Sequence, residues 1–229
     1  MSEGAYLYDL PGLTPYGAAL RLQQELAAAR SQQAIPDTVL LLEHEPVITL
    51  GSRAVRAEEL PLAESEYAAR GIDIVDVPRG GRSTYHGPGQ LVCYPILDLN
   101  ARGRDLRRHV RGLEQTIVAT LHEFGVEGRS VEEPHQSGVW AGDRKIASIG
   151  VRCARWVTSH GLAINVDLDL AVYDLFDACG LRGASFTSIS AETGRPVTTA
   201  EVRAPLLRAL AEAFDLDLDR VPLEDHALV

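Results

Sequence analysis

The sequence predicts an α+β fold, with a mixed and mainly antiparallel sheet flanked by helices. Segments with the pattern of strands come in runs, and helical segments interrupt these runs without a regular strand–helix–strand rhythm. The chain has 229 residues, of which 45% are hydrophobic, and this is enough to bury a substantial core. No internal repeat, low-complexity linker or clear boundary divides it. We therefore expect residues 1–229 to form a single domain.

The N-terminal half predicts short strands and two helices. Thr14 and Pro15 mark a helix start, with threonine as the N-cap and proline at the first helical position. The following stretch, rich in Ala, Leu, Gln and Arg, continues this helix to about residue 34. A short helix is expected near residues 62–70. The expected strands lie near residues 6–8, 38–42, 47–50, 72–77 and 91–97.

The C-terminal half predicts two longer helices around an antiparallel region. Apolar residues at helical spacing indicate a helix over about residues 105–124. Residues 138–146 resemble a hairpin with its turn near Gly142 and Asp143, and further antiparallel strands are expected up to Val166. Thr198 and Glu201 have the spacing of a capping box, which predicts a last helix ending near Phe214.

Charge and hydropathy exclude several classes of protein. No run approaches the roughly 18 apolar residues that span a bilayer, so we expect no membrane partner. The first residues are acidic and lack the layout of a signal peptide, which favours a cytoplasmic location. The formal net charge of −10 argues against non-specific binding of nucleic acid.

The cysteines indicate a reducing compartment. There are three, Cys93, Cys153 and Cys179, and they show no close metal-type pairing. We therefore expect no structural disulfide, and no zinc or other metal site. Cys93 and Cys153 lie in apolar, strand-like runs and are interpreted as small buried hydrophobic residues.

A glycine-rich loop over residues 79–90 is the most informative local feature. Four glycines and one proline alternate there with arginine, threonine, tyrosine, histidine and glutamine side chains. Glycine lets a ligand approach the backbone closely, and this loop joins two expected strands. The composition predicts a ligand-binding loop. It contains no complete nucleotide-binding signature.

Cys179 and Lys145 are the candidates for chemistry. Cys179 precedes Gly180, which would allow a tight bend that exposes the sulfur, but a cysteine alone can equally be inert. Lys145 is the only lysine in the chain, and lysine can lose its proton when desolvated. The alternative for Lys145 is an ordinary exposed residue in a turn.

Histidines give weaker signals. His86 and His160 each precede a glycine; His86 could activate Cys179, although a structural histidine is the more frequent case. The acidic and histidine side chains of residues 43–45 are interpreted as loop polarity, because no matching metal-ligand spacing follows them.

Taken together, the motifs resemble one enzyme family. The ordered motifs are Arg79-Gly-Gly-x-x-Thr84-Tyr-His86-Gly-Pro-Gly-Gln90, Gly138-Val-Trp140, Lys145-Ile-Ala-Ser-Ile-Gly150, His160-Gly-Leu-Ala-Ile-Asn165 and Cys179-Gly180. They are similar to those of the lipoyl(octanoyl) transferases of lipoate biosynthesis and span most of the chain. One departure is Ala178, where the family often has proline before the cysteine.

The resemblance implies a fold related to the catalytic domains of biotin protein ligases and lipoate ligases. It implies transfer of an octanoyl group from acyl carrier protein to a lysine of a lipoyl domain, through a cysteine acyl-thioester and without metal or soluble cofactor. Carried over by position, Cys179 is the nucleophile, and Lys145 stabilises its thiolate or serves as acid and base. The implied substrate-binding residues are Arg79, Gly80, Gly81, Arg82, Ser83, Thr84, Tyr85, His86, Ser148, Ile149, Gly150, Gly161, Leu162 and Ala163.

The same resemblance suggests partners. The implied donor is octanoyl-acyl carrier protein, and the implied acceptors are lipoyl domains of 2-oxoacid dehydrogenase complexes and the glycine cleavage H protein. Arg104, Arg107, Arg108 and Arg111 share one face of the predicted helix and could dock the acidic carrier, or could simply be solvated. No long heptad repeat demands a dimer, so we expect a monomer.

Two other functions remain open at this point. The first is an ATP-dependent lipoate or biotin ligase on the same scaffold, which would need no cysteine. The arginine- and glycine-rich loop associated with biotin ligases is absent from the sequence, which counts against that branch. The second is a non-catalytic acyl-binding protein that retains the pocket.

Overall fold

The computed structural model describes residues 3–131, 137–178 and 185–222. Within them, the strands form a nine-stranded sheet and a three-stranded sheet. The strands are β1 (Glu3–Thr14), β2 (Asp37–His44), β3 (Val47–Leu50), β4 (Asp73–Asp76), β5 (Ser83–His86), β6 (Gln90–Ile96), β7 (Gly128–Ser130), β8 (Gly138–Ala141), β9 (Arg144–Ala154), β10 (Val157–Asn165), β11 (Ser185–Phe186) and β12 (Leu216–Arg220). The helices are α1 (Tyr16–Ser31), α2 (Arg56–Glu59), α3 (Glu64–Ala68), α4 (Leu106–Glu123), α5 (Ile189–Thr193) and α6 (Thr199–Phe214), with a 3₁₀ helix η1 (Leu170–Leu175).

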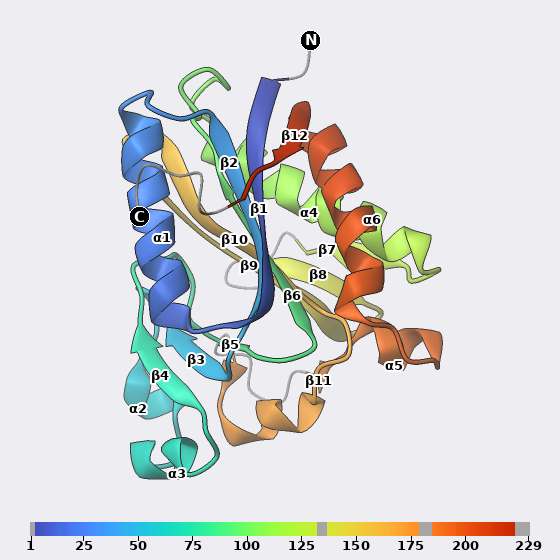
Figure 1. Ribbon diagram of the computed structural model, residues 1–229. Helices are drawn as coiled ribbons and strands as arrows, with labels where there is room; N and C mark the ends of the chain where they lie inside the picture. The colour runs from blue at the N-terminus through green and yellow to red at the C-terminus, as the bar shows by residue number, and fades with distance from the viewer. Residues whose placement is uncertain (1–2, 132–136, 179–184, 223–229) are drawn as a thin grey trace.

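The large sheet is mixed and mainly antiparallel, as the sequence predicts. Its order is β12-β1-β2-β6-β10-β9-β8-β7, and β11 pairs in parallel with the start of β9. Parallel pairing joins β12, β1 and β2, whereas antiparallel pairing continues from β2 to β7. The small sheet has the order β4-β3-β5 and lies with α2 and α3 at the lower end of the large sheet (Figure 1).

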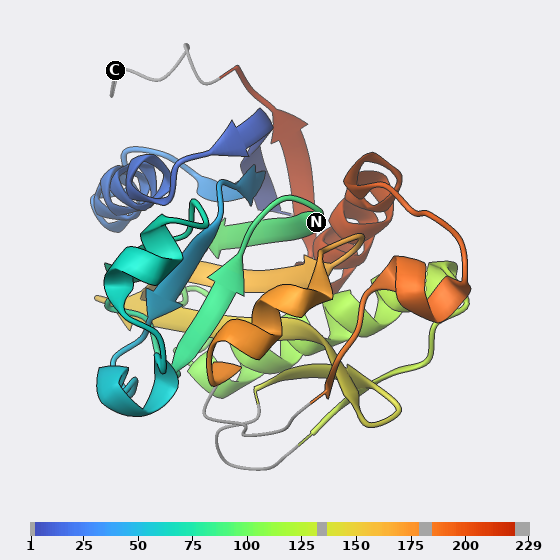
Figure 2. The same cartoon turned by 90° about the horizontal axis from the view of Figure 1, so that it is seen from below.

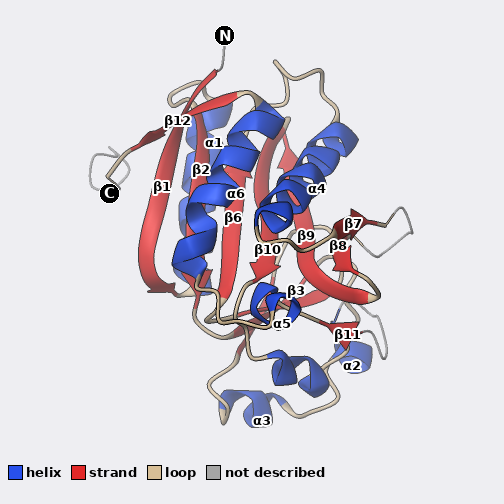
Figure 3. Cartoon of the chain, turned by 90° about the vertical axis from the view of Figure 1, so that its right-hand side faces the viewer, coloured by secondary structure: helices blue, strands red, loops and turns tan. Residues whose placement is uncertain are grey.

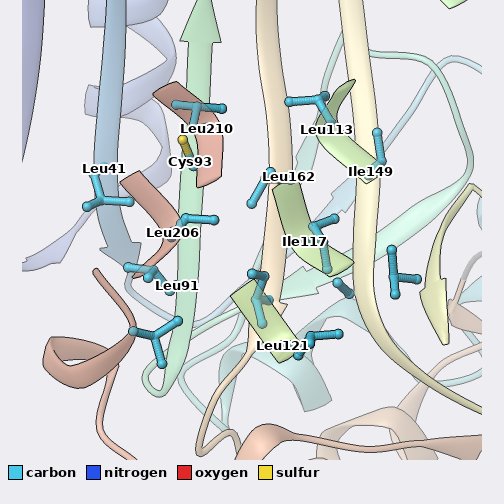
Figure 4. Close-up of a cluster of buried hydrophobic side chains, with 14 of the residues drawn as sticks. Leu41, Leu91, Cys93, Leu113, Ile117, Leu121, Ile149, Leu162, Leu206 and Leu210 are labelled. Carbon is cyan, nitrogen blue, oxygen red and sulfur yellow. The ribbon is translucent and has the colours of Figure 1, made fainter. Parts of the chain in front are cut away.

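Helices cover both faces of the large sheet. Figure 3 shows α4 and α6 crossing one face, and α1 lies on the opposite face. Strand β2 shows why the core has two halves: Val39 and Leu41 point into the cluster under α4 and α6, whereas Leu40 and Leu42 point into the cluster under α1. A strand buried on both faces is apolar at successive positions. Figure 4 shows how the larger half packs, with Leu41, Leu91 and Leu162 of the sheet facing Leu113, Ile117 and Leu206 of the helices.

The ends of the two long C-terminal helices follow the sequence signals. The Asp105 carboxylate accepts a hydrogen bond from the Arg108 backbone N–H (2.9 Å) and caps α4. Thr198 and Glu201 form the expected capping box at α6. The hairpin of β8 and β9 turns at Gly142 and Asp143, also as expected.

Two expectations for the N-terminal region are wrong. Thr14 does not cap α1: it pairs with His44 as the last residue of β1, and Pro15 takes the N-cap position. The expected short strand near residue 6 is twelve residues long, because β1 is held between β2 and β12. Pro11 and Gly12 look like chain breakers in the sequence, but they occupy an irregularity in the pairing of β1 with β2. No helix among the described residues is both long and apolar enough to cross a membrane.

His109 is a buried titratable group between α4 and α6. Its ring lies 5.2 Å from the Phe214 ring, centroid to centroid, and the residue is 2% exposed. Neither ring nitrogen has a hydrogen-bond partner within the described part of the chain. Burial, reinforced by the positive charge of Arg102, lowers the pKa of His109 to about 4. The folded protein therefore holds this histidine neutral.

This histidine should make the folded state sensitive to acid. Below pH 6.5 the unfolded chain binds a proton at His109 that the folded chain excludes until about pH 4, so stability falls as the pH drops through this window. At pH 5 the contribution of His109 to this loss is about 2 kcal/mol of unfolding free energy. Urea unfolding at pH 7.5 and pH 5 should show a correspondingly smaller loss in His109→Leu. His122→Leu, at an exposed position of the same helix, should lose as much as the wild type. An equal loss in His109→Leu would contradict the prediction.

Candidate active site

A cavity of about 260 Å³ lies where the glycine-rich loop meets strands β9 and β10. Its walls come from the loop before β5, from β9 and β10, and from the first turns of α1 and α4. The sequence-predicted site residues that line it are Arg79, Gly80, Gly81, Arg82, Ser83, Thr84, His86, Lys145, Ser148, Ile149, Gly150, Gly161, Leu162 and Ala163. The tertiary structure thus brings together three motifs that are widely separated in the sequence.

Tyr85 is the exception among the predicted lining residues. Its side chain packs in a different buried cluster, with Ile48, Leu50 and Phe176. Its ring lies edge-on to that of Tyr173, with centroids 6.5 Å apart. The prediction that Tyr85 lines the pocket is therefore wrong. The Tyr85 side chain packs in this other cluster and is not among the residues that line the cavity.

Arg79 fixes the loop to both sheets. Its guanidinium donates hydrogen bonds to the Thr49 carbonyl (2.9 Å) and hydroxyl (2.7 Å) in the small sheet, and to the carbonyls of Gly80 and Arg82 in its own loop. The next backbone N–H, that of Gly80, donates to the Val151 carbonyl of β9 (2.9 Å). A Cβ at Gly150 would lie 3.0 Å from the Arg79 Cδ, so glycine lets the arginine stem pass close to β9.

Lys145 lies in the cavity wall although it is almost entirely buried. It belongs to β9, and the residue is 1% exposed. Gly138 of the neighbouring strand makes room for it: a Cβ there would lie 2.8 Å from the Lys145 Cε and 2.2 Å from the Ala147 carbonyl oxygen. Gly138 also has φ +145°, a conformation that favours glycine. Burial distinguishes Lys145 from an exposed turn lysine, which was the alternative from the sequence.

Cys179 and Gly180 lie outside the described residues, but the chain on both sides of them is anchored beside the cavity. On the N-terminal side, the Asp177 carbonyl accepts a hydrogen bond from the Ser83 hydroxyl (2.9 Å), and Ala178 is buried. On the C-terminal side, Phe186 pairs with Lys145, and the Thr187 N–H donates to the Lys145 carbonyl (3.0 Å). The described chain is therefore bonded to Ser83 just before residue 179 and to Lys145 just after residue 184.

A buried cluster of histidines and tyrosines forms the side of the cavity next to α1. His44 Nε2 is 2.8 Å from the Tyr94 hydroxyl, and Tyr16 and His86 stack with ring centroids 6.0 Å apart. Burial lowers the pKa of His44 to about 4 and that of His160 to about 3, and lowers the pKa of His86 far below its ordinary value. Arg79 reinforces the effect at His86 and His160. These histidines are therefore neutral near pH 7 and add polarity without charge.

The sequence did not predict that His44, Tyr16 and Tyr94 belong to this cluster. The expectation that residues 43–45 are only loop polarity is wrong for His44, which ends β2, is 0% exposed and also bonds the Thr14 carbonyl. Tyr16 and Tyr94 give no distinct signal, because aromatic residues at these positions look like ordinary core residues. The described residues include no group of histidine, cysteine or carboxylate side chains suited to a metal ion.

The cavity is positive although the chain is negative. Its lining includes Arg53, Arg79, Arg82 and Lys145, and no aspartate or glutamate among the described lining residues. The whole chain has 32 acidic residues against 22 lysines and arginines. The apolar residues of the lining include Leu106, Val110, Ile149, Leu162 and Ala163. The combination suits an extended apolar group attached to a polar or anionic carrier.

The arginines predicted on one face of α4 separate in the structure. Arg107 lies between Leu106 and Val110, which both line the cavity. Arg108 instead lines a second hollow, with His109 and Phe214 on the side of α6. Arg104 lies over the Trp156 ring, with its Cζ 5.8 Å from the ring centroid. Arg107 itself is exposed and is not among the residues that line either hollow.

Known proteins match the chain over most of its length. The model of the family "Lipoyl protein ligase A/B catalytic domain" matches residues 15–211. The octanoyltransferase of Chloroflexus aurantiacus is 46% identical over 209 residues, which cover 90% of this chain and 92% of that protein. The octanoyltransferase of Geobacter metallireducens is 43% identical over 217 residues, covering 94% of this chain and 95% of that protein.

Solved structures confirm the predicted fold relation. A lipoate-protein ligase A bound with ATP superposes with a TM-score of 0.76 at 20% identity, covering 100% of this chain and 92% of that chain. The biotin protein ligase of Aquifex aeolicus in complex with biotin and ATP gives 0.58 at 15% identity, covering 91% of this chain and 70% of that chain. These identities show a shared fold alone. With the family match and the curated relatives, they establish that the chain belongs to the lipoyl protein ligase A/B catalytic-domain family, among the octanoyltransferases.

Proposed function

We propose that this protein transfers an octanoyl group from octanoyl-acyl carrier protein to a lysine of a lipoyl domain, through a thioester on Cys179. The observation that supports this most directly is the position of Lys145. Its side chain is buried in the wall of a cavity that has several apolar lining residues, and the chain on each side of residues 179–184 is held at that wall.

In the first half of the reaction, the Cys179 thiolate attacks the carbonyl carbon of the octanoyl thioester. The carbon–sulfur bond to the carrier breaks, and the carrier leaves as a thiol after it takes up a proton. One thioester replaces another, so this step needs no ATP. The Lys145 ammonium would stabilise the attacking thiolate, or Lys145 would exchange protons with the reacting groups.

In the second half, the amine of the acceptor lysine attacks the Cys179 thioester. An amide forms, the bond from the acyl carbon to the Cys179 sulfur breaks, and the amine loses a proton. An amide is more stable than a thioester, so the transfer is favourable. The acceptors in this proposal are lipoyl domains of 2-oxoacid dehydrogenase complexes and the glycine cleavage H protein, and the protein acts as a cytoplasmic monomer.

The neutral histidines fit this chemistry as part of the pocket. A protonated imidazole in the wall would attract water and oppose the burial of an apolar chain. The low pKa values of His44, His86 and His160 exclude that charge near pH 7. His86 also has its Nδ1 2.7 Å from the Gln90 Oε1, so one ring nitrogen is engaged within the protein. The proposal therefore gives the activation of Cys179 to Lys145 and the binding of substrate to the loop.

The thioester route predicts a covalent intermediate. Mixing the protein with octanoyl-acyl carrier protein, without ATP and without acceptor, should increase its intact mass by one octanoyl group. The increase should be absent in Cys179→Ser and should persist in Cys153→Ser, because Cys153 is half-buried on β9 and does not line the cavity. Full turnover by Cys179→Ser, or a requirement for ATP, would support the ligase alternative instead. Binding of the donor without any transfer would support a non-catalytic acyl-binding protein.

Lys145→Met tests the partner of the cysteine, since methionine keeps the length of the stem and removes the charge. The rate of acyl-enzyme formation near pH 7 should fall by about 100-fold or more. If Lys145 acts only as a cation that stabilises the thiolate, raising the pH should restore much of the rate. If it transfers protons, the loss should remain at high pH. An unchanged rate near neutral pH would contradict either role.

Arg107 should contribute to docking of the acidic carrier protein, because it is exposed in the first turn of α4 and follows the cavity-lining residue Leu106. Arg107→Glu should raise the apparent KM for octanoyl-acyl carrier protein several-fold and weaken the dependence of KM on salt. Arg108→Glu is the matched control: the charge change is the same, but the residue faces the hollow beside α6. Neither variant should alter the reaction with the uncharged donor octanoyl-N-acetylcysteamine. Equal effects of the two variants on the carrier reaction would show a general charge effect instead.

A further inference from the structure

Glu59 is a buried carboxylate at the junction between the cavity loop and the chain that leads to Cys179. It is the last residue of α2, and it is 0% exposed. Its neighbour Glu58 has a side chain that is 58% exposed. A buried carboxylate is costly unless hydrogen bonds replace its water, so its contacts show what it holds.

The carboxylate of Glu59 binds the cavity loop. Its Oε2 accepts a hydrogen bond from the Ser83 N–H (2.7 Å), and its Oε1 accepts from the Arg82 Nε (2.7 Å) and from the Val55 N–H (2.9 Å). Burial alone would raise the pKa of Glu59, but the hydrogen bonds from Ser83, Val55 and Arg82 outweigh it and lower the pKa. The group is therefore ionised while it binds Arg82 and Ser83, which both line the cavity.

The same residue binds the chain before Cys179. The Asp177 N–H donates to the Glu59 carbonyl oxygen (2.8 Å), and the Asp177 carbonyl accepts from the Ser83 hydroxyl (2.9 Å). Both backbone groups of Asp177 are thus hydrogen-bonded, the N–H to Glu59 and the carbonyl to Ser83. Ser83 is in turn bound by the Glu59 carboxylate. Phe176 and Ala178, on either side of Asp177, are buried in the cluster behind β5. The chain leaves this anchor for residue 179 immediately after Ala178.

We propose that Glu59 is a positioning residue that holds the acyl-binding loop and the chain leading to Cys179 in one fixed relation. This inference rests on the proposed thioester route, in which the acyl carbonyl must lie next to the Cys179 sulfur. Glu59 itself does not touch substrate. It acts through Ser83 and Arg82 on one side and through Asp177 on the other.

The relation matters because the cavity binds the acyl chain and the cysteine attacks its first carbon. A displacement of about 1 Å between them can reduce a reaction rate by about 100-fold. A donor with a short acyl group gains little from the cavity and loses little when the alignment is lost. The ratio of octanoyl to acetyl transfer therefore reports alignment, whereas a loss of folded protein lowers both rates equally.

The test compares Glu59→Gln with Glu58→Gln. Glu58 also binds Arg82, through its exposed side chain (2.9 Å), so its variant removes a charge on the same arginine without touching Ser83 or Asp177. Acylation of each variant by octanoyl- and acetyl-N-acetylcysteamine is followed by intact mass. In Glu59→Gln the octanoyl-to-acetyl rate ratio should fall by about ten-fold, and in Glu58→Gln it should equal that of the wild type. An unchanged ratio in Glu59→Gln, with both rates reduced alike, would overturn the proposal.

A second variant and a second measurement test the same relation without depending on how well Glu59→Gln folds. Ser83→Ala removes the hydrogen bond to the Asp177 carbonyl and keeps the N–H that Glu59 binds, so it should lower the ratio in the same direction. Amide hydrogen exchange needs no reaction. Glu59→Gln should speed exchange at both Ser83 and Asp177, and Glu58→Gln should not. Unchanged exchange at both sites would overturn the proposal, whereas a wild type that forms no acyl-enzyme would contradict the thioester route alone.

Discussion

The attachment of the glycine-rich loop to one strand of each sheet, β3 and β9, is the constraint on which the site depends. Arg79 binds Thr49 of β3, and the Gly80 N–H binds the Val151 carbonyl of β9. These bonds hold the loop beside the strand that carries Lys145 and so fix one wall of the cavity. The attachment is polar because a loop without regular pairing must satisfy its own backbone groups. Glycines at positions 80 and 150 let the loop and the arginine stem pass close to β9. Figure 2, the view from below, shows the small sheet with α2 and α3 in front of the large sheet.

The chemistry of the site follows from what that wall encloses. Three of the cations in the cavity wall have contacts that fix the site. Arg79 and Arg82 hold the loop, and Lys145 lies where β11, the strand that follows residues 179–184, pairs with β9. The histidines that look reactive in the sequence are held neutral by burial, so they shape the pocket rather than charge it. Glu59 is a buried anion at the place where the loop meets the chain before Cys179. In the proposed reaction, binding and chemistry are carried by different residues.

The cavity lining and the chain as a whole differ in charge. The chain has an excess of acidic residues, yet the described lining of the cavity contains only cations and neutral groups. Because charge interactions are local, an acidic partner can approach a basic opening on a protein whose total charge is negative. Helix α4 contributes to two hollows: Leu106 and Val110 line the cavity, whereas Arg108 and His109 line the hollow on the side of α6.

The sequence by itself determined the class of fold, the long helices, the β8–β9 hairpin and the motifs that meet at the cavity, because these depend on local periodicity, capping and turn residues. It could not determine the length of β1, which is held between β2 and a strand from the opposite end of the chain, β12, nor the burial of His44 at the end of β2. The side of β5 to which Tyr85 points was also decided only in three dimensions. So was the role of Glu59, whose partners are 23 to 118 positions away along the chain, apart from Val55. Local patterns carry no information about which distant carbonyl or N–H a side chain will meet, and the tertiary structure decides it.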